Sequence, residues 1–250
     1  SGVASTSNST GALVVNGGVG VAGTIYTNDV VLSSITTLGG SASYDGVTSY
    51  LTLSDNSAFN MASNNFTVEA WVNLSVVNST QRRIFSYQAT GSSTVLWFGI
   101  SPANKFNGEI RSSTGTNDTT LVSSTTPIAG VWYHVAFVRN SGNTYLYVNG
   151  TQEATATGQT QTLGSGGAPV VGAYTGTLSN LWNGYITNLR VVNGTAMYTT
   201  NFTPSTSPLT STSNTSLLML ETSSSSFLTD SSSHNFTDRK STRLNSSHGY

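Results

Sequence analysis

The carboxylates are the first residues to consider for catalysis, because paired Asp or Glu side chains can act as acid and base. A retaining glycosidase needs two carboxyl groups about 5 to 5.5 Å apart, and residues on one face of a strand are two positions apart. No other acidic residue lies within five positions of any of the glutamates, which are Glu69, Glu109, Glu153 and Glu221. We therefore expect no enzyme of this kind, although a pair assembled from separate strands stays an alternative.

Other nucleophile and ligand chemistry has little support in the sequence. The chain contains no cysteine, which excludes a thiol nucleophile, a disulfide framework and a cysteine zinc site. His134 alternates with Tyr133 and Val135 in "WYHVAF". This alternation is typical of a histidine satisfied on a sheet face rather than of a catalytic base.

The elements that position these residues are predicted to be strands. Charged residues make up 8% of the chain, against about 25% in an ordinary globular domain. A disordered chain would hold few aromatic residues, yet this chain has 9 Phe, 4 Trp and 11 Tyr. No apolar run approaches the roughly 20 residues of a membrane helix, and no signal peptide is visible. We expect a soluble all-β protein without a membrane partner.

Alternating segments place most of these strands between residues 42 and 237. In "NFTVEAWVNL" the residues at positions 66, 68, 70 and 72 are apolar and alternate with a second set that includes Trp71. The clearest hairpin joins residues 131–139 and 144–148 through the turn at 140–143. The sequence has many predicted strands with turns about every 8 to 12 residues, a spacing typical of all-β domains. This spacing predicts a two-sheet antiparallel jelly-roll sandwich.

Residues 1–40 form a separate Gly/Ser/Thr-rich segment with three short apolar runs. An isolated hairpin of this size is marginal in water, so it needs stacked copies or sister chains to cover its apolar face. The stretch "STSNSTGALVVNGGVGVAGTIYTNDV" resembles a repeat of bacteriophage tail fibres. The resemblance implies a short Gly-rich β-stalk through which three copies assemble as a homotrimer; a Gly-rich linker is the alternative.

The last residues, 238–250, differ abruptly in composition, because Arg239, Lys240 and Arg243 crowd together there. A basic tail that contacts phosphates would be one interpretation. However, "DRKSTRLNSSH" resembles one reading frame of a common short-read sequencing adapter. We therefore interpret this segment as artefactual, expect an environmental (metagenomic) assembly as its source, and expect no nucleic-acid partner.

Three blocks of the remaining sequence carry a family resemblance. They are "YDGVTSYLTLSDNSAFNMASNNFTVEAWV", "WYHVAFVRNSGNTYLYVNG" and "WNGYITNLRVVNGTAMYTTNFTPSTSPLT". These blocks resemble the laminin-G-like jelly-roll domains of the concanavalin A-like lectin/glucanase superfamily, in the form found in marine phage structural proteins. Residues 215–220 and 227–237 fit the family's closing strands. Because the adapter-like segment follows directly, we expect one sheet position to be left as an open edge.

The resemblance implies a structural calcium ion, held by carboxylate and backbone oxygens. The first and last strands of such a fold are neighbours, which would bring Asp45 of "YDG" towards Asp230 of "TDSSS". Asp55 and Asp118 are alternatives in loops. Turn-capping aspartates that bond their own backbone are an equally good interpretation of all four.

Glycan binding requires exposed aromatic rings that stack on sugar faces, together with a few fixed polar partners. Three of the four tryptophans fall in the family-like blocks, and we expect them in the core: Trp71, Trp132 and Trp182. The candidates for a concave face or loop rim lie in less family-like segments and are Tyr87, Trp97 and Arg111.

These observations predict a non-enzymatic virion appendage, a phage tail fibre or related structural protein, whose jelly roll binds glycans or polysaccharide on the host surface. Several copies in one fibre would multiply weak binding by avidity. A secreted bacterial adhesin or carbohydrate-binding module, located at the cell surface, is the alternative. A divergent glycoside hydrolase is the third possibility.

Overall fold

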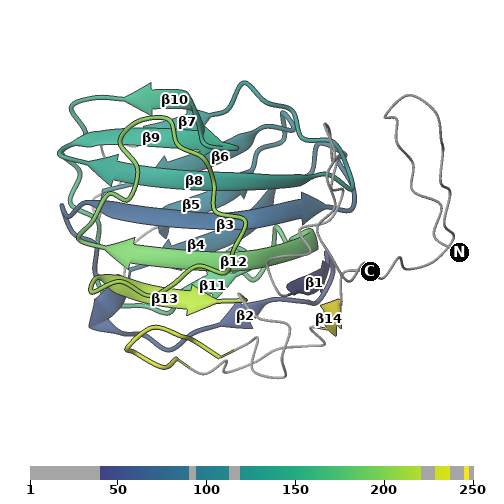
Figure 1. Ribbon diagram of the computed structural model, residues 1–250. Coiled ribbons are helices and arrows are strands. Elements are labelled where there is room, and N and C mark those ends of the chain that lie inside the picture. Colours follow the sequence, from purple (N-terminus) through teal and green to yellow (C-terminus); the bar gives the residue numbers. More distant parts are fainter. Residues whose placement is uncertain (1–39, 90–93, 113–118, 221–228, 237–244, 248–250) are drawn as a thin grey trace, which may run out of the picture. The chain divides into compact units, whose positions relative to one another are not determined.

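The computed structural model describes residues 40–89, 94–112, 119–220, 229–236 and 245–247. These residues form two antiparallel β-sheets packed face to face, with no regular element other than strands except one short 3₁₀ turn (Figure 1). The predicted all-β sandwich is confirmed. Within these ranges, no helix has the length and apolar character needed to span a membrane. The predicted stalk at residues 1–39 lies outside the described residues.

The first sheet has eight strands in the order β10-β9-β8-β3-β12-β1-β14, and β13 also pairs with β12. Its strands are β1 (Ser41–Asp45), β3 (Phe66–Leu74), β8 (Trp132–Asn140), β9 (Asn143–Val148), β10 (Thr151–Ala156), β12 (Asn183–Asn193), β13 (Thr215–Met219) and β14 (Asn245–Ser247).

The second sheet has six strands in the order β2-β11-β4-β5-β6-β7. Its strands are β2 (Leu51–Thr52), β4 (Arg82–Gln88), β5 (Thr94–Ile100), β6 (Phe106–Ile110), β7 (Thr119–Val122) and β11 (Val170–Val171), and the 3₁₀ turn η1 spans Ser57–Phe59.

The core lies between the two sheets and follows the alternation seen in the sequence. On β3, the residues at 66, 68, 70 and 72 are at most 1% exposed and belong to one core cluster, as predicted. Phe98 of β5 stacks on Phe137 of β8 at a ring distance of 6.1 Å, which joins the sheets directly. The outer faces of both sheets therefore carry the remaining, mostly polar, positions.

The predicted hairpin is present, with a tighter turn than expected. Asn140 pairs with Asn143, and the two residues between them have φ values of 48° at Ser141 and 77° at Gly142. Two successive left-handed residues match the twist of the flanking strands, which is why a glycine follows the serine here.

The C-terminal part follows the predicted strand order only in part. β13 matches the expected strand at 215–220, but the described residues 229–236 contain no strand. The sheet position beyond β1 holds β14, where Ser41 pairs with Ser247. This strand comes from the adapter-like segment, and backbone pairing at a sheet edge depends little on sequence.

Candidate functional site

The outer face of the six-stranded sheet presents a tryptophan at its centre. Leu96, Phe98 and Ile100 of β5 point into the core, so the alternation directs Trp97 outward. Trp97 pairs with Ser86 of β4 on one side and with Glu109 of β6 on the other.

Two arginines approach this indole. The Arg83 guanidinium carbon lies 4.3 Å from the ring centroid, and that of Arg111 lies 5.0 Å from it. The pairing of Arg83 with Gly99 places Arg83 towards the C-terminal end of β5, whereas Arg111 follows Glu109 towards the opposite end. Both distances are within the range of cation–π attraction.

A carboxylate and a phenol complete the group, which we call the Trp97 cluster: Arg83, Trp97, Glu109, Arg111 and Tyr174. Arg111 Nε donates to Glu109 Oε1 over 2.6 Å. The Tyr174 ring lies 5.8 Å from that of Trp97. The cluster holds two cations and one carboxylate, in a chain whose formal net charge is −1.

Arg83 is the unusual member of the cluster. Its side chain is fully buried, and none of its three guanidinium nitrogens has a hydrogen-bond partner among the described residues. Burial lowers the pKa of Arg83 to about 10, an effect that the Glu109 charge opposes, so the group stays charged at neutral pH. The buried Trp97 Nε1 also lacks a partner within the described ranges. Both groups are pure donors, so the site has donors in excess of acceptors.

Two of the three predicted glycan-binding residues, Trp97 and Arg111, come together in this cluster, whereas Tyr87 does not. The expectation that Tyr87 lies on an exposed rim is wrong, because its side chain is fully buried in the core. Its hydroxyl donates to Asn60 Oδ1 over 3.2 Å. Burial, aided by the charge of Asp55, raises the pKa of Tyr87 to about 12.

The eight-stranded sheet carries a different polar group on its outer face. Glu69 accepts hydrogen bonds from Arg190 Nε over 2.8 Å, from Tyr198 Oη over 2.7 Å and from His134 Nε2 over 3.1 Å. Glu69 is fully buried. Although burial works in the opposite direction, the hydrogen bond from His134 and the charge of Arg190 lower the pKa of the Glu69 carboxyl group.

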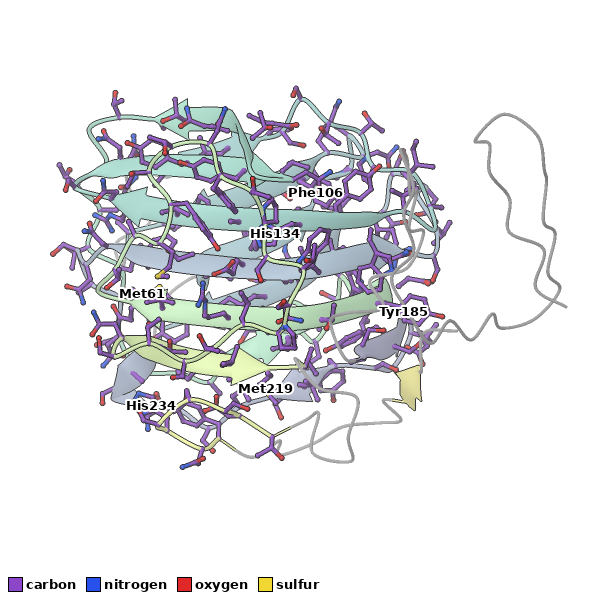
Figure 2. The ribbon with its side chains drawn as sticks, in the orientation of Figure 1. Met61, Phe106, His134, Tyr185, Met219 and His234 are labelled. Atoms are coloured by element: carbon purple, nitrogen blue, oxygen red, sulfur yellow. The ribbon has the colours of Figure 1, made fainter. Side chains whose placement is uncertain are left out.

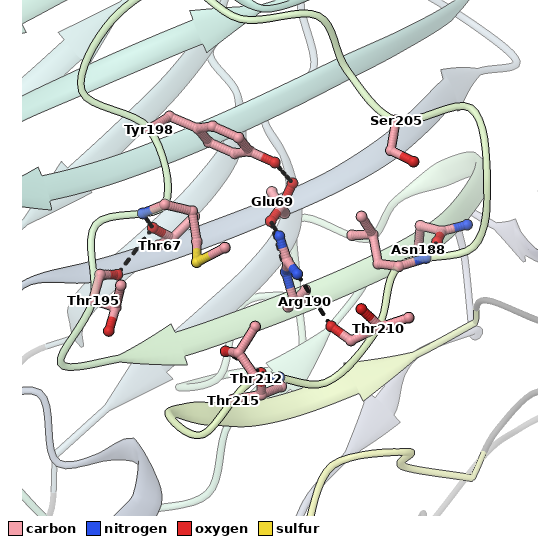
Figure 3. A network of polar contacts seen from close by, with 12 residues as sticks. Thr67, Glu69, Asn188, Arg190, Thr195, Tyr198, Ser205, Thr210, Thr212 and Thr215 are labelled. Carbon is pink, nitrogen blue, oxygen red and sulfur yellow. Dashed lines mark hydrogen bonds and ion pairs between the residues drawn. The ribbon is translucent and has the colours of Figure 1, made fainter.

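This network fastens residues 194–214, which we call the covering loop, across the sheet (Figures 1 and 3). The loop supplies Tyr198 to Glu69, and its Thr210 carbonyl accepts from Arg190 Nη1 over 3.1 Å. The Tyr198 and Phe202 rings stack at 3.5 Å, and both rings pack against His134. The histidine therefore lies buried on a sheet face, as its sequence pattern indicates, under a loop that the sequence pattern did not predict.

The three tryptophans expected in the core differ in their positions. Trp182 is fully buried, as predicted. Trp71 and Trp132 are only half-buried and lie on the outer face of the eight-stranded sheet, so their assignment to the core is wrong. Trp71 Nε1 donates to the Ser205 carbonyl of the covering loop over 3.0 Å. Trp132 packs against Tyr185 at 6.3 Å, near the end of β12 that pairs with β1 (Figure 2).

The described glutamates do not form a close catalytic pair across the sandwich. Glu69 and Glu109 are on the outer faces of different sheets, and packed sheets lie about 10 Å apart. Their carboxyl groups therefore point away from one another, whereas a retaining mechanism needs about 5 to 5.5 Å. Glu153 is bonded to Thr125.

The predicted calcium ligands are used as turn caps. Asp45 Oδ1 accepts from the amides of Val47, Thr48 and Ser49 over 2.8 to 2.9 Å. Although partial burial works in the opposite direction, these bonds and the Thr48 hydroxyl lower the pKa of Asp45.

Asp230 has the same role, since both of its carboxylate oxygens accept hydrogen bonds, from the amides of Leu218, Ser232 and Phe236 and from the Ser232 hydroxyl. Among the described residues no group of three or more His, Cys, Asp or Glu side chains could hold a metal ion. The donors aimed at Asp45 and Asp230 do not fit a calcium ion shared between them, and Asp118 lies outside the described residues.

Comparison with known proteins agrees with this sandwich. A laminin G family model, described as the concanavalin A-like lectin/glucanases superfamily, matches residues 45–198. This match covers more than half of the 250 residues, so the chain belongs to that superfamily. No curated protein gives a significant sequence match.

Several solved structures share the fold. A protein named for carbohydrate binding from Bacteroides ovatus has a TM-score of 0.58 and 14% identity, with 84% of this chain and 59% of that chain covered. The SAP-like pentraxin of Limulus polyphemus has a TM-score of 0.51 and 19% identity, with 66% and 79% covered. Domains LG4-5 of the mouse laminin alpha1 chain have a TM-score of 0.50 and 12% identity, with 66% and 47% covered. The chain thus spans less than two thirds of the Bacteroides ovatus protein and of the laminin domains.

Proposed function

We propose that this chain is a non-enzymatic glycan-binding protein whose binding site is the Trp97 cluster. The observation that carries the proposal is a half-buried tryptophan flanked by two arginines on a sheet face, with buried donors that lack acceptors within the described part of the chain. Aromatic rings together with a few fixed polar groups are what sugar recognition requires. Membership of a lectin-containing superfamily and the name of the Bacteroides ovatus neighbour, a carbohydrate binding protein, point the same way.

We propose further that the jelly roll is the host-contacting part of a phage tail fibre or similar virion appendage. This part of the proposal rests on the fibre-like sequence of residues 5–30. Three chains would assemble through the stalk, and the resulting avidity would compensate for weak single sites. The adapter-like residues 238–250 have no part in this function.

The alternative is a secreted bacterial adhesin or carbohydrate-binding module at the cell surface. Both alternatives use the same sugar site and differ in what precedes the jelly roll. Light scattering tests the fibre, because a homotrimer would support assembly through the stalk, whereas a monomer at high concentration would show that this single repeat is insufficient for it. A divergent glycosidase is disfavoured by the opposed positions of Glu69 and Glu109.

A glycan array probed with the full chain tests the sugar-binding proposal. We expect binding that Trp97→Ala weakens at least about tenfold, since tryptophans at binding hot spots contribute ~2 kcal/mol or more. Trp132→Ala is the matched control, because it removes a half-buried indole from the other sheet. Loss of binding in Trp132→Ala with full binding in Trp97→Ala would move the site to the eight-stranded sheet. Absence of binding to every glycan would refute the proposal.

A further inference from the structure

The charge balance of the Trp97 cluster indicates which sugars it can bind. Arg83 and Arg111 bring two positive charges and Glu109 one negative charge. Glu109 is bonded to Arg111, while Arg83 has no hydrogen-bond partner among the described residues. Among the described residues the Arg83 charge therefore has no ion-pair partner, although the Glu109 charge acts on it from nearby.

Such an arrangement is costly in a folded protein. A buried ion without a partner loses hydration that nothing replaces, and substitution of such groups by apolar residues is often neutral or stabilising. The chain nonetheless places the guanidinium of Arg83 against Trp97, on a sheet face that also carries the more accessible Arg111, with 36% of its side chain exposed. Residues that cost stability and remain are typical of binding sites.

The two arginines can contribute to the binding of an anion in different ways. Arg111 is accessible and can offer a pair of parallel N–H donors to a carboxylate or sulfate. Arg83 is buried against the same indole, and its charge attracts the same anion through a medium of low dielectric constant. The half-buried Trp97 ring between them provides the apolar surface against which the sugar ring packs.

We propose that the Trp97 cluster selects acidic sugars, that is, glycans with an anionic substituent, and that this substituent displaces Glu109 from Arg111. The inference rests on the proposed glycan-binding function and specifies its ligand class. Glu109 holds Arg111 in place in the absence of ligand and gives it up to the incoming anion. Neutral sugars gain nothing from the unpaired charge and bind weakly.

The test compares matched oligosaccharides by calorimetry with the full chain. Alginate hexasaccharide supplies uronic carboxylates, its carboxyl-reduced form is the neutral counterpart, and a sulfated galactan oligosaccharide separates sulfate from carboxylate. We expect binding to one of the acidic probes, weakening at high salt, and at least about tenfold weaker binding by the neutral form.

Four variants assign the roles. Arg111→Gln should weaken acidic binding at least about tenfold, because it removes a charge-assisted contact. Glu109→Gln should strengthen it, because it removes the carboxylate that competes with the ligand for Arg111, and a misfolded variant could not give this opposite sign. Arg83→Met should weaken binding without lowering the melting temperature. Lys105→Gln is the control, because it removes a charge from the β5–β6 connection outside the cluster. It should change neither the binding of acidic sugars nor the melting temperature.

The outcomes separate the two proposals. Equal binding of the acidic and neutral probes, or unchanged binding in Arg111→Gln, overturns the acidic selectivity and leaves glycan binding in place. A marked loss of stability in Arg83→Met overturns the role given to Arg83 and makes it a structural residue. If no acidic or neutral glycan binds at all, the proposed function itself fails.

Discussion

Replacement of Glu69 by glutamine tests how the covering loop is held. The change removes the only carboxylate that the described structure bonds to Arg190, whose side chain is 6% exposed. Removal of one partner of a buried ion pair lowers the free energy of unfolding by about 3 to 5 kcal/mol, because the remaining charge stays buried without compensation. Since glutamine can keep a hydrogen bond to Tyr198 or His134, we expect the lower end, about 3 kcal/mol.

The same substitution should change how stability depends on pH. The pKa of Glu69 is lower in the folded protein than in the unfolded chain. Its contribution is therefore fully present above the unfolded value of about 4.3 and is lost as the pH falls through the folded value. In Glu69→Gln this acid-dependent loss disappears, so the two stability curves should converge at low pH.

Urea and thermal denaturation, both followed by tryptophan fluorescence at several pH values, measure both effects. A loss of about 3 kcal/mol corresponds to a decrease of roughly 6 to 12 °C in melting temperature for a domain of this size. Glu153→Gln is the control, because that carboxylate is partly exposed and bonded only to Thr125 among the contacts described. A Glu69→Gln variant within about 1 kcal/mol of the original protein at neutral pH would refute the account of the network.

Two further predictions concern the sheet spacing and the aspartate caps. A methyl group on Gly108 would lie 2.5 Å from the Phe137 ring, so Gly108→Ala should destabilise the sandwich by about 1 to 3 kcal/mol; recovery in the Gly108→Ala, Phe137→Leu double variant checks the cause. A chelator tests whether Asp45 and Asp230 hold calcium. Because both carboxylates accept backbone hydrogen bonds, we expect an unchanged melting temperature, and a decrease would support the calcium site.

The sequence predicts the sandwich well where local alternation decides the structure. The period of two along β3 assigns its core face without reference to any other strand, and the hairpin of β8 and β9 follows from its turn residues. The same period also sets Trp71 opposite the apolar residues, so local evidence already favoured an outer position. Family resemblance alone placed Trp71 in the core, and the covering loop explains how a tryptophan is accommodated outside it.

Residues around β4 show why the candidate site could be predicted only in part. A β-bulge between Arg83 and Phe85 interrupts the alternation, so Ile84 and Phe85 are both buried in the core. Tyr87 therefore lies on the core face with Phe85, while Arg83 is directed to the outer face. No local pattern reveals the bulge, and the meeting of Arg83, Trp97 and Arg111 depends on the register of three strands.

The buried charged groups on the two outer faces differ in whether the rest of the chain supplies them with partners. This difference favours the six-stranded sheet as the binding face. On the eight-stranded sheet, the covering loop supplies partners to the charged groups: Glu69 has Tyr198, and Arg190 has Thr210. On the six-stranded sheet, the buried donors of Arg83 and Trp97 have no such partners among the described residues. Because a buried charge without a partner is costly, the six-stranded face, which holds Arg83, is the one where an external anion would gain most.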